Sequence, residues 1–275
     1  MKPVIAIIGG LGEMGRWFSR FFREQGFTVL IGEPELTPSC AEVAAQADVV
    51  VISVPLHLTE AVIQELAPFI RPEALLTDLT SLKQGPMQAM LQHCAGAVVG
   101  THPLFGPGEK SLVGQNVVLC RGRGEEWFTW LHDLLAAGGA KIQITTPEEH
   151  DRLMSLVQGL THFTLISLGT TFRRLQADIH AMETLATPTF RAVYDQVHHL
   201  VNQNFPLYAH IQLLNPQNRL THAAFAEAVE QLRQIVLAGD AAALMQILEE
   251  NQRYFEQWQN ANQVGRENCS MKNNR

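Results

Sequence analysis

Three polar segments carry the side chains best suited to chemistry, and each directly follows a predicted strand. They cover residues 53–57 (Ser-Val-Pro-Leu-His), 78–86 (Asp-Leu-Thr-Ser-Leu-Lys-Gln-Gly-Pro) and 100–107 (Gly-Thr-His-Pro-Leu-Phe-Gly-Pro). In an open parallel sheet, ligands bind outside the carboxyl ends of the strands. We therefore expect a single site at the sheet edge where these segments meet.

His102 is the residue of these segments that best suits proton transfer. It comes directly after a predicted strand over residues 98–100 and before Pro103, in a loop that Gly106 and Pro107 restrict. A fixed neutral imidazole accepts a proton from a substrate hydroxyl while hydride leaves the same carbon, so activity should rise with pH near ~6.5. A loop histidine bonded to a neighbouring carbonyl is the alternative, and the spacing alone does not decide between them.

A glycine-rich turn near the N-terminus has the pattern of a dinucleotide-binding loop. Gly10, Gly12 and Gly15 form a G-x-G-x-x-G that follows the apolar segment 4–8 and opens an amphipathic helix. In such a loop Gly10 allows the tight turn, Gly12 lets the backbone approach a pyrophosphate, and Gly15 allows close packing of helix on strand. The pyrophosphate would bind at the helix N-terminus. A Rossmann-like domain that binds a different ligand is the alternative.

An acidic residue stands where the adenosine ribose would bind. Glu33 lies 18 residues after Gly15, beyond the predicted strand 28–31. A carboxylate here accepts hydrogen bonds from ribose hydroxyls and repels the 2′-phosphate of NADP, and no arginine follows it nearby. The predicted cofactor is therefore NAD. We expect further contacts to the cofactor from Met14, Ser53, Val54 and Pro55.

The pattern of apolar residues divides the chain. Strands are predicted at 4–8, 28–31, 48–54, 75–78 and 98–100, with added edge strands at 116–120 and 141–144. The amphipathic segments between them indicate βαβ units. Thr146 and Pro147 mark a strong helix start, after which only helical patterns follow, over 150–175, 179–185, 190–201 and 223–259.

The predicted fold is an α/β Rossmann-type doubly wound parallel sheet followed by an all-α second domain. The dinucleotide-binding domain is expected over residues 1–145 and a helical domain for substrate binding and dimerisation over 146–262. Residues 263–275 are polar and are expected to form a frayed tail.

Composition and charge exclude several classes of partner. The net charge of −7 and the absence of a basic run argue against nucleic acid. The cysteines at 40, 94, 120 and 269 are scattered, which favours reduced thiols in the cytoplasm over disulfides or a metal site. The apolar segment 4–8 is too short for a signal peptide, and no segment approaches the ~20 apolar residues of a membrane span.

Taken together, the motifs resemble the prephenate dehydrogenase family. The likeness rests on residues 10–15, 80–86, 102–107, 149–151 (Glu-His-Asp) and 160–163 (Leu-Thr-His-Phe), and His-Pro-x-Phe-Gly-Pro at 102–107 is its most specific part. Within this family, the sequence is similar to the dehydrogenase part of the enterobacterial bifunctional enzymes. No segment resembling a chorismate mutase precedes the first strand, so mutase activity is not expected. His150 matches a family histidine, although a surface position at a helix start suits it equally.

The resemblance implies roles for individual residues. His102 would accept the proton of the ring hydroxyl, and Ser81 would lie near that hydroxyl and the nicotinamide. Lys83, on the same loop as Ser81, would be structural or would lie near the substrate or cofactor. His162 and Arg191 would line the substrate pocket of the second domain.

One position departs from the family pattern. The family usually has an arginine eight residues after the one that matches Arg191, where it holds the ring carboxylate of prephenate, and His199 stands there. A neutral imidazole cannot make the bidentate contact of a guanidinium. Either His199 is charged in the substrate pocket, or another cation such as Arg173 or Arg174 takes the place of the family's arginine, or the substrate is not prephenate.

The resemblance therefore implies oxidative decarboxylation of prephenate to 4-hydroxyphenylpyruvate, in tyrosine biosynthesis, by a homodimer. Arogenate or 4-amino-4-deoxyprephenate could take the place of prephenate. A β-hydroxyacid dehydrogenase has the same two-domain plan, but those enzymes centre on a lysine of the helical domain, and the 102–107 loop does not suit them. A sensor that binds NAD without turnover is the remaining alternative.

The first prediction concerns the choice of cofactor. Catalytic efficiency with NAD should greatly exceed that with NADP, because Glu33 would face the 2′-phosphate. At ~4 Å this repulsion is about 1 kcal/mol per charge pair in water and about 4 kcal/mol at the dielectric of a protein surface. Steady-state kinetics with the two cofactors test it, and equal efficiencies would contradict the ribose role of Glu33.

Overall fold

The computed structural model describes the backbone of residues 2–272 and the side chains as far as residue 259. Residues up to Thr221 form one compact unit, and those from His222 onward form a second. Within the described chain, no helix combines the length and the apolar character that crossing a membrane requires.

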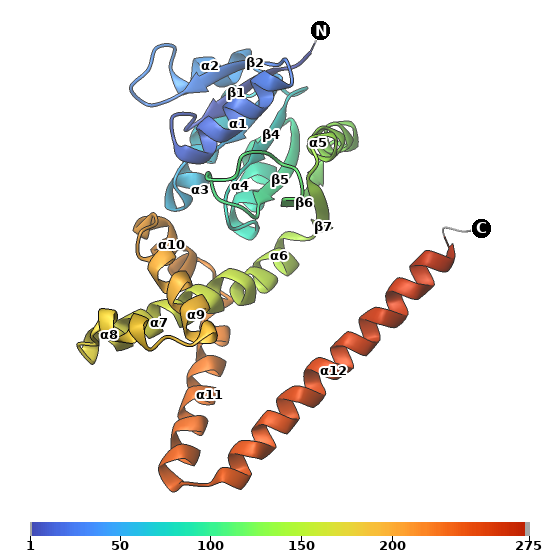
Figure 1. The fold of residues 1–275 in the computed structure, drawn as a ribbon. Coiled ribbons are helices and arrows are strands. Elements are labelled where there is room, and N and C mark those ends of the chain that lie inside the picture. Colours follow the sequence, from blue (N-terminus) through green and yellow to red (C-terminus); the bar gives the residue numbers. More distant parts are fainter. Residues whose placement is uncertain (1, 273–275) are drawn as a thin grey trace. The chain divides into compact units, whose positions relative to one another are not determined.

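The N-terminal part of the first unit is a seven-stranded sheet with the order β2-β1-β3-β4-β5-β6-β7 (Figure 1). The strands are β1 (Val4–Ile8), β2 (Thr28–Gly32), β3 (Val49–Ile52), β4 (Leu75–Asp78), β5 (Ala97–Pro103), β6 (Asn116–Arg123) and β7 (Lys141–Thr145). All neighbours are parallel except β5 and β6, which are antiparallel. The predicted doubly wound sheet is confirmed, with β6 and β7 at its edge.

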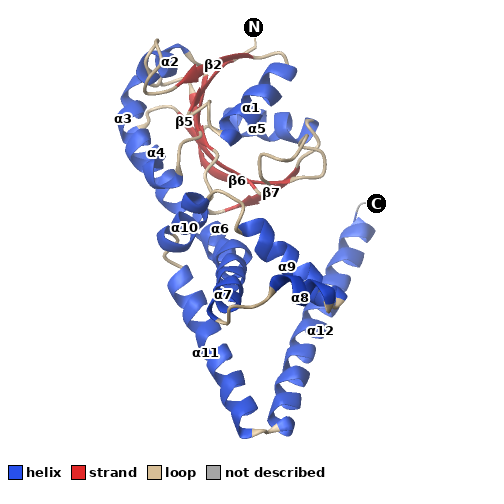
Figure 2. Cartoon of the chain, turned by 60° about the vertical axis from the view of Figure 1, so that its left-hand side comes forward, coloured by secondary structure: helices blue, strands red, loops and turns tan. Residues whose placement is uncertain are grey.

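Helices cover both faces of this sheet, as Figure 2 shows. One face carries α1 (Glu13–Glu24) and α5 (Glu125–Ala137), and the other carries α2 (Cys40–Gln46), α3 (Thr59–Leu66) and α4 (Gln84–His93). Side chains alternate between faces along a strand, so Ile5 and Ile7 pack with the α1 side while Ala6 and Ile8 pack with the other. Burial on both faces explains why β1 is a continuous apolar segment.

Between β7 and residue 272 every regular element is a helix, as predicted. They are α6 (Pro147–Met154), a π-helix (Ser155–Leu160), α7 (Thr161–Arg174), α8 (Ile179–Thr184), α9 (Pro188–Leu200), α10 (Phe205–Leu214), α11 (Asn218–Ala238) and α12 (Ala241–Lys272). The Thr146 side chain caps α6 by accepting a hydrogen bond from Glu149 N at 3.2 Å. The predicted domain division at 145/146 falls at this junction and stays a prediction. The predicted tail over 263–275 also stays a prediction. Helix α12 continues to Lys272, and residues 273–275 lie outside the described chain.

Two expectations about the helices were wrong. The pattern over 223–259 is two helices, because Gly239 adopts a φ of +65° between α11 and α12. Helix α10 was not predicted at all. Among its apolar side chains Ile211 is buried, whereas Phe205 and Leu213 are 63% and 77% exposed, so the sequence shows no apolar stripe of helical period.

A fully buried ion pair fastens the end of β4 to β5. Lys83 and Asp78 both have side chains with 0% exposure, and Lys83 Nζ donates to Asp78 Oδ2. The same ammonium donates to Thr101 O at 2.9 Å, while Asp78 Oδ1 accepts from Thr101 N at 3.1 Å. The pair thereby extends the β4–β5 contact past the last paired residues of the two strands.

The second prediction is that Lys83→Met destabilises the protein by ~3–5 kcal/mol, because it leaves the Asp78 carboxylate buried without its counter-charge. Removing both charges, in Asp78→Leu with Lys83→Met, should recover part of the loss. Urea denaturation gives the free energies of unfolding. Arg152→Gln, which breaks an exposed ion pair with Glu149, is the control and should leave stability unchanged. A Lys83→Met variant as stable as the control would show that the pair does not hold the fold.

Candidate active site

The tight turn of the glycine loop is made by Gly9, which corrects the role expected of Gly10. Gly9 has a φ of +81°, and a Cβ there would lie 2.5 Å from Ser53 O. Gly10 instead packs against β2, where a Cβ would meet Ile31 Cδ1 at 2.6 Å. The loop thus requires glycine at both positions, for backbone conformation at the first and for close packing at the second.

The other two glycines fit a bound pyrophosphate. A Cβ at Gly15 would lie 2.3 Å from Gly9 O, so only glycine lets α1 approach the strand this closely. Gly12 is the N-cap residue of α1 and has no side chain to satisfy the N–H groups of the first turn. Such free N–H groups and the helix dipole bind phosphate. The residues present therefore suit the phosphates of a dinucleotide.

At the ribose end, Glu33 lies against the glycine loop as its position predicted. Its Oε1 accepts a hydrogen bond from Leu11 N at 2.6 Å. Arg16, which the sequence reasoning passed over, donates from Nε to Leu11 O at 2.6 Å. The backbone N–H of Leu11 thus fixes the Glu33 carboxylate beside the loop, and the backbone carbonyl of Leu11 fixes the Arg16 guanidinium.

A cavity of about 420 Å³ lies along the loop and the carboxyl ends of β3 and β4. Its lining includes six residues expected from sequence: Gly12, Met14, Ser53, Val54, Pro55 and Ser81. It also includes Glu13, Leu56, His57, Leu79, Thr80, Pro107, Asn204, Pro206, Leu207 and His210. The glycine loop, all three polar segments and α10 therefore share one cavity.

His102 lies inside β5, opposite Val118 of β6, and not in the following loop as expected. The strand is longer than its apolar part, because pairing with β6 continues through Thr101, His102 and Pro103. The imidazole is 3% exposed, and its Nδ1 lies 2.8 Å from His150 Nε2. A strand position holds this ring more firmly than a loop would.

A chain of hydrogen bonds sets the tautomer of His102. His150 Nδ1 lies 2.7 Å from Asp151 Oδ1, and a carboxylate can only accept, so His150 donates there. The Nε2 of a neutral His150 is then an acceptor, and His102 Nδ1 must donate to it. The lone pair of His102 is left on Nε2, the nitrogen that a base would use. His150 is 1% exposed, so its alternative as a surface residue was wrong.

Asp151 is itself held by the N-terminus of α4. Its Oδ1 accepts from Lys83 N at 2.8 Å, and its Oδ2 accepts from Gln84 N at 2.9 Å. The carbonyl of Asp151 accepts from Asn215 Nδ2 at 2.8 Å, beyond the end of α10. The carboxylate therefore lies where the α4 dipole stabilises a negative charge.

The surroundings of His102 favour its neutral form. Burial, His150 and Lys83 together hold the pKa of His102 well below its usual value of 6.5. Desolvation penalises the imidazolium, and the Lys83 ammonium repels it. Loss of the base by protonation should accordingly occur at a lower pH than the sequence suggested.

The loop after β5 is anchored on α1. The Phe105 ring lies 5.0 Å from Trp17 between ring centroids, and Trp17 Nε1 donates to Glu109 O at 2.6 Å. Leu104 N also donates to Asn116 O at 2.9 Å, which continues the strand pairing. These contacts explain why an aromatic residue follows the His-Pro pair.

The structure separates several expected substrate contacts from the cavity. Lys83 points into the core and contacts Asp78, so it has the structural position that was one of its alternatives. His162, on α7, is half-buried against Tyr208, with ring centroids 4.6 Å apart. Its Nδ1 has no hydrogen-bond partner, and burial lowers its pKa. Neither residue lines the cavity.

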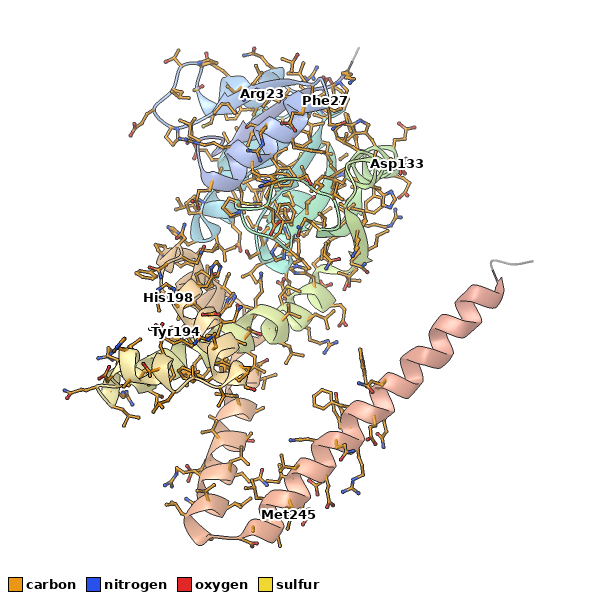
Figure 3. The ribbon with its side chains drawn as sticks, in the orientation of Figure 1. Arg23, Phe27, Asp133, Tyr194, His198 and Met245 are labelled. Carbon is orange, nitrogen blue, oxygen red and sulfur yellow. The ribbon has the colours of Figure 1, made fainter. Side chains whose placement is uncertain are left out.

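Arg191 and His199 are exposed on α9 and do not line the cavity either. Arg191 makes one long contact, from Nη2 to Glu183 O at 3.5 Å. His198, the neighbour of His199, stacks on Tyr194 with ring centroids 6.2 Å apart, and Figure 3 labels both on α9. The substrate roles of Arg191 and His199 therefore remain predictions.

Sequence reasoning missed three residues of the site: Asp151, His57 and His210. Asp151 was noticed only as part of a motif, although an acid next to a candidate histidine is itself a signal. His57 lies in one of the three polar segments, and α10, which carries His210, was not predicted. Their proximity depends on tertiary structure that local patterns do not reveal.

Comparison with known proteins matches two family models. Residues 29–144 match the nucleotide-binding domain of prephenate dehydrogenase, and residues 146–250 match its dimerisation domain. A solved prephenate dehydrogenase from A. aeolicus, in complex with hydroxyphenyl propionate and NAD+, has a TM-score of 0.73 at 19% identity, covering 91% of this chain and 96% of its own. At that identity the likeness concerns the fold.

Two curated relatives are closer in sequence. A probable arogenate/prephenate dehydrogenase of Methanocaldococcus jannaschii is 37% identical over 91% of this chain and 60% of its own length. The T-protein of Enterobacter agglomerans is 34% identical over 93% of this chain and 68% of its own. The chain thus spans 60% and 68% of the lengths of these two relatives. With both domain models and these identities, the chain belongs to the prephenate dehydrogenase family of NAD-dependent oxidoreductases.

Proposed function

We propose that the chain oxidises prephenate with NAD and releases carbon dioxide to give 4-hydroxyphenylpyruvate, a step of tyrosine biosynthesis. The observation that carries the proposal is the His102–His150–Asp151 chain, which leaves a lone pair on Nε2 of a buried imidazole. That imidazole lies in β5, next to β4, and the loop after β4 lines the cavity with Ser81.

In this reaction His102 Nε2 accepts the proton of the substrate hydroxyl. The imidazolium that forms donates from Nδ1 to His150 as before, so no hydrogen bond has to reverse. The Asp151 carboxylate stabilises the new positive charge through His150. Ser81, in the cavity, would orient the hydroxyl.

NAD, when bound, accepts the hydride from the carbon that carries the hydroxyl. The first turn of α1 and Gly12 would hold its pyrophosphate, and Glu33 its adenosine ribose. Ser53, Val54 and Pro55 would line its path along the cavity. These assignments support NAD because each site residue suits the chemical group it would face.

A homodimer is part of the proposal, since residues 146–250 match a dimerisation domain. Large apolar side chains such as Leu220, Val236 and Leu237 of α11 are 66–74% exposed, as expected of a surface that a second copy covers. A location in the cytoplasm, suggested by the scattered cysteines, also belongs to the proposal.

The third prediction tests the substrate. Prephenate should have a higher kcat/KM with NAD than arogenate or 4-amino-4-deoxyprephenate, because Ser81 and a neutral His102 suit a hydroxyl on the reacting carbon, and the one carboxylate in the described cavity lining, Glu13, lies at the start of α1, where the cofactor would bind. NADH formation at saturating NAD measures all three. A marked preference for arogenate or the 4-amino compound would move the chain to that substrate. Binding of NAD without NADH formation in a single turnover would make it a sensor.

The fourth prediction concerns the base. His102→Asn should lower kcat by ~10²–10⁴-fold and leave the affinity for NAD unchanged, because only the proton acceptor is lost. In the wild type, kcat/KM should hold its plateau at pH 6.5 and fall only at lower pH, since the pKa of His102 lies below that value. His93→Asn, an exposed histidine at the end of α4, is the matched control. Near-normal turnover in His102→Asn would remove His102 from the chemistry.

A further inference from the structure

Two histidines from distant parts of the chain meet at the cavity. His57 follows β3 in a short 3₁₀ turn (Leu56–Leu58), and His210 lies on α10. Their ring centroids are 4.2 Å apart and their planes are tilted by 31°. Both line the cavity that also contains Gly12 and Ser81.

Buried apolar residues next to each histidine in the chain fix the backbone that carries the pair. Leu56, the neighbour of His57, and Ile211, the neighbour of His210, form a buried cluster with Leu82. Their exposed fractions are 9%, 4% and 7%. The start of α10 is fixed as well, because Asn204 Oδ1 accepts from Leu207 N at 3.2 Å. The backbone positions of both histidines at the cavity wall are thus fixed, and their rings lie against each other there.

The cavity otherwise lacks a positive side chain. None of its lining residues is a lysine or an arginine, and the one that carries a full charge is the acid Glu13. Prephenate, however, carries two carboxylates: one is attached to the ring carbon opposite the hydroxyl-bearing carbon, and the other ends the pyruvyl side chain on that same carbon. Within the described lining, His57 and His210 are thus the side chains able to become cationic and pair with such a group.

We infer that His57 and His210 form a subsite that binds the side-chain carboxylate of the substrate. The inference rests on the proposed function. Each imidazole offers an N–H, so the two rings can contact the two oxygens of one carboxylate. The pyrophosphate is a less suitable occupant, since the N-terminus of α1 already offers it free N–H groups.

The side-chain carboxylate suits this subsite better than the ring carboxylate. Its charge is the same before and after the reaction, so binding it stabilises ground state and transition state equally. A cation on the ring carboxylate would instead stabilise a charge that is lost as carbon dioxide leaves. The pair is therefore a specificity feature, and its loss should raise KM more than it lowers kcat.

The experiment measures binding with two probes that differ in the carboxylate. 4-Hydroxyphenylpropionate has it and 4-ethylphenol lacks it, and calorimetric titration in saturating NAD gives both dissociation constants. In His57→Gln with His210→Gln, the constant for the acid should rise about 10- to 100-fold, as for loss of hydrogen bonds to a charge, while that for the phenol stays unchanged. His57→Arg should retain binding of the acid. His93→Gln is the control, and circular dichroism verifies folding.

Two results would overturn the inference. If the double variant loses affinity for NAD but binds the acid normally, the pair serves the pyrophosphate. If it binds both probes and NAD like the control, the pair is only structural. Turnover of prephenate by the wild type is scored separately. If the wild type turns prephenate over but the double variant binds the acid as tightly as the wild type does, only the subsite is rejected. If the wild type does not turn prephenate over, the proposed function is rejected, and the binding constants of the two probes still test the subsite.

Discussion

The buried charge of Lys83 is the constraint on which the site depends. An ammonium with 0% exposure is costly unless every proton finds an acceptor, and Lys83 Nζ has three: Asp78 Oδ2, Thr80 Oγ1 at 3.3 Å and Thr101 O at 2.9 Å. These acceptors come from the end of β4, the loop after it and β5. The chain can bury the charge only if the strand ends and the loop adopt one arrangement, which is the arrangement that brings Ser81 to the cavity.

The backbone of the same lysine continues the network toward the base. Lys83 N donates to Asp151, which lies on α6 beyond the sheet. Asp151 accepts a hydrogen bond from His150, and His150 accepts one from His102. Because the Asp151 carboxylate can only accept, it determines which atom donates in both hydrogen bonds. The ammonium also repels a proton from His102, adding to the effect of burial. One residue thus fixes the loop, supports the carboxylate that orients His102, and favours the neutral form of His102, the proposed base.

Sequence reasoning was most successful where burial alone decides the structure. The strands over 4–8 and 75–78 were predicted to the residue, because the first is apolar throughout and the second begins with Leu75 and Leu76, which are buried on opposite faces of the sheet. It failed for β5, where polar residues continue a strand because β6 pairs with them. It also failed for α10, which is held by a single buried Ile211 and not by an apolar stripe. His57 and His210 come together only through that helix, so no local pattern could have paired them.

The charges of the site fall into two groups, those that the proposed reaction changes and those that it leaves constant. The phosphates of the cofactor and the side-chain carboxylate of prephenate keep their charge, and the groups proposed for them, the α1 N-terminus and the His57–His210 pair, lie at the accessible cavity. The group whose charge changes, His102, is buried and starts neutral. Charge that forms during the reaction therefore forms where the dielectric is low and Asp151 is already oriented, so little reorganisation is needed. Groups that bind constant charges gain nothing from such burial, which is consistent with the inferred role of two histidines at the cavity wall.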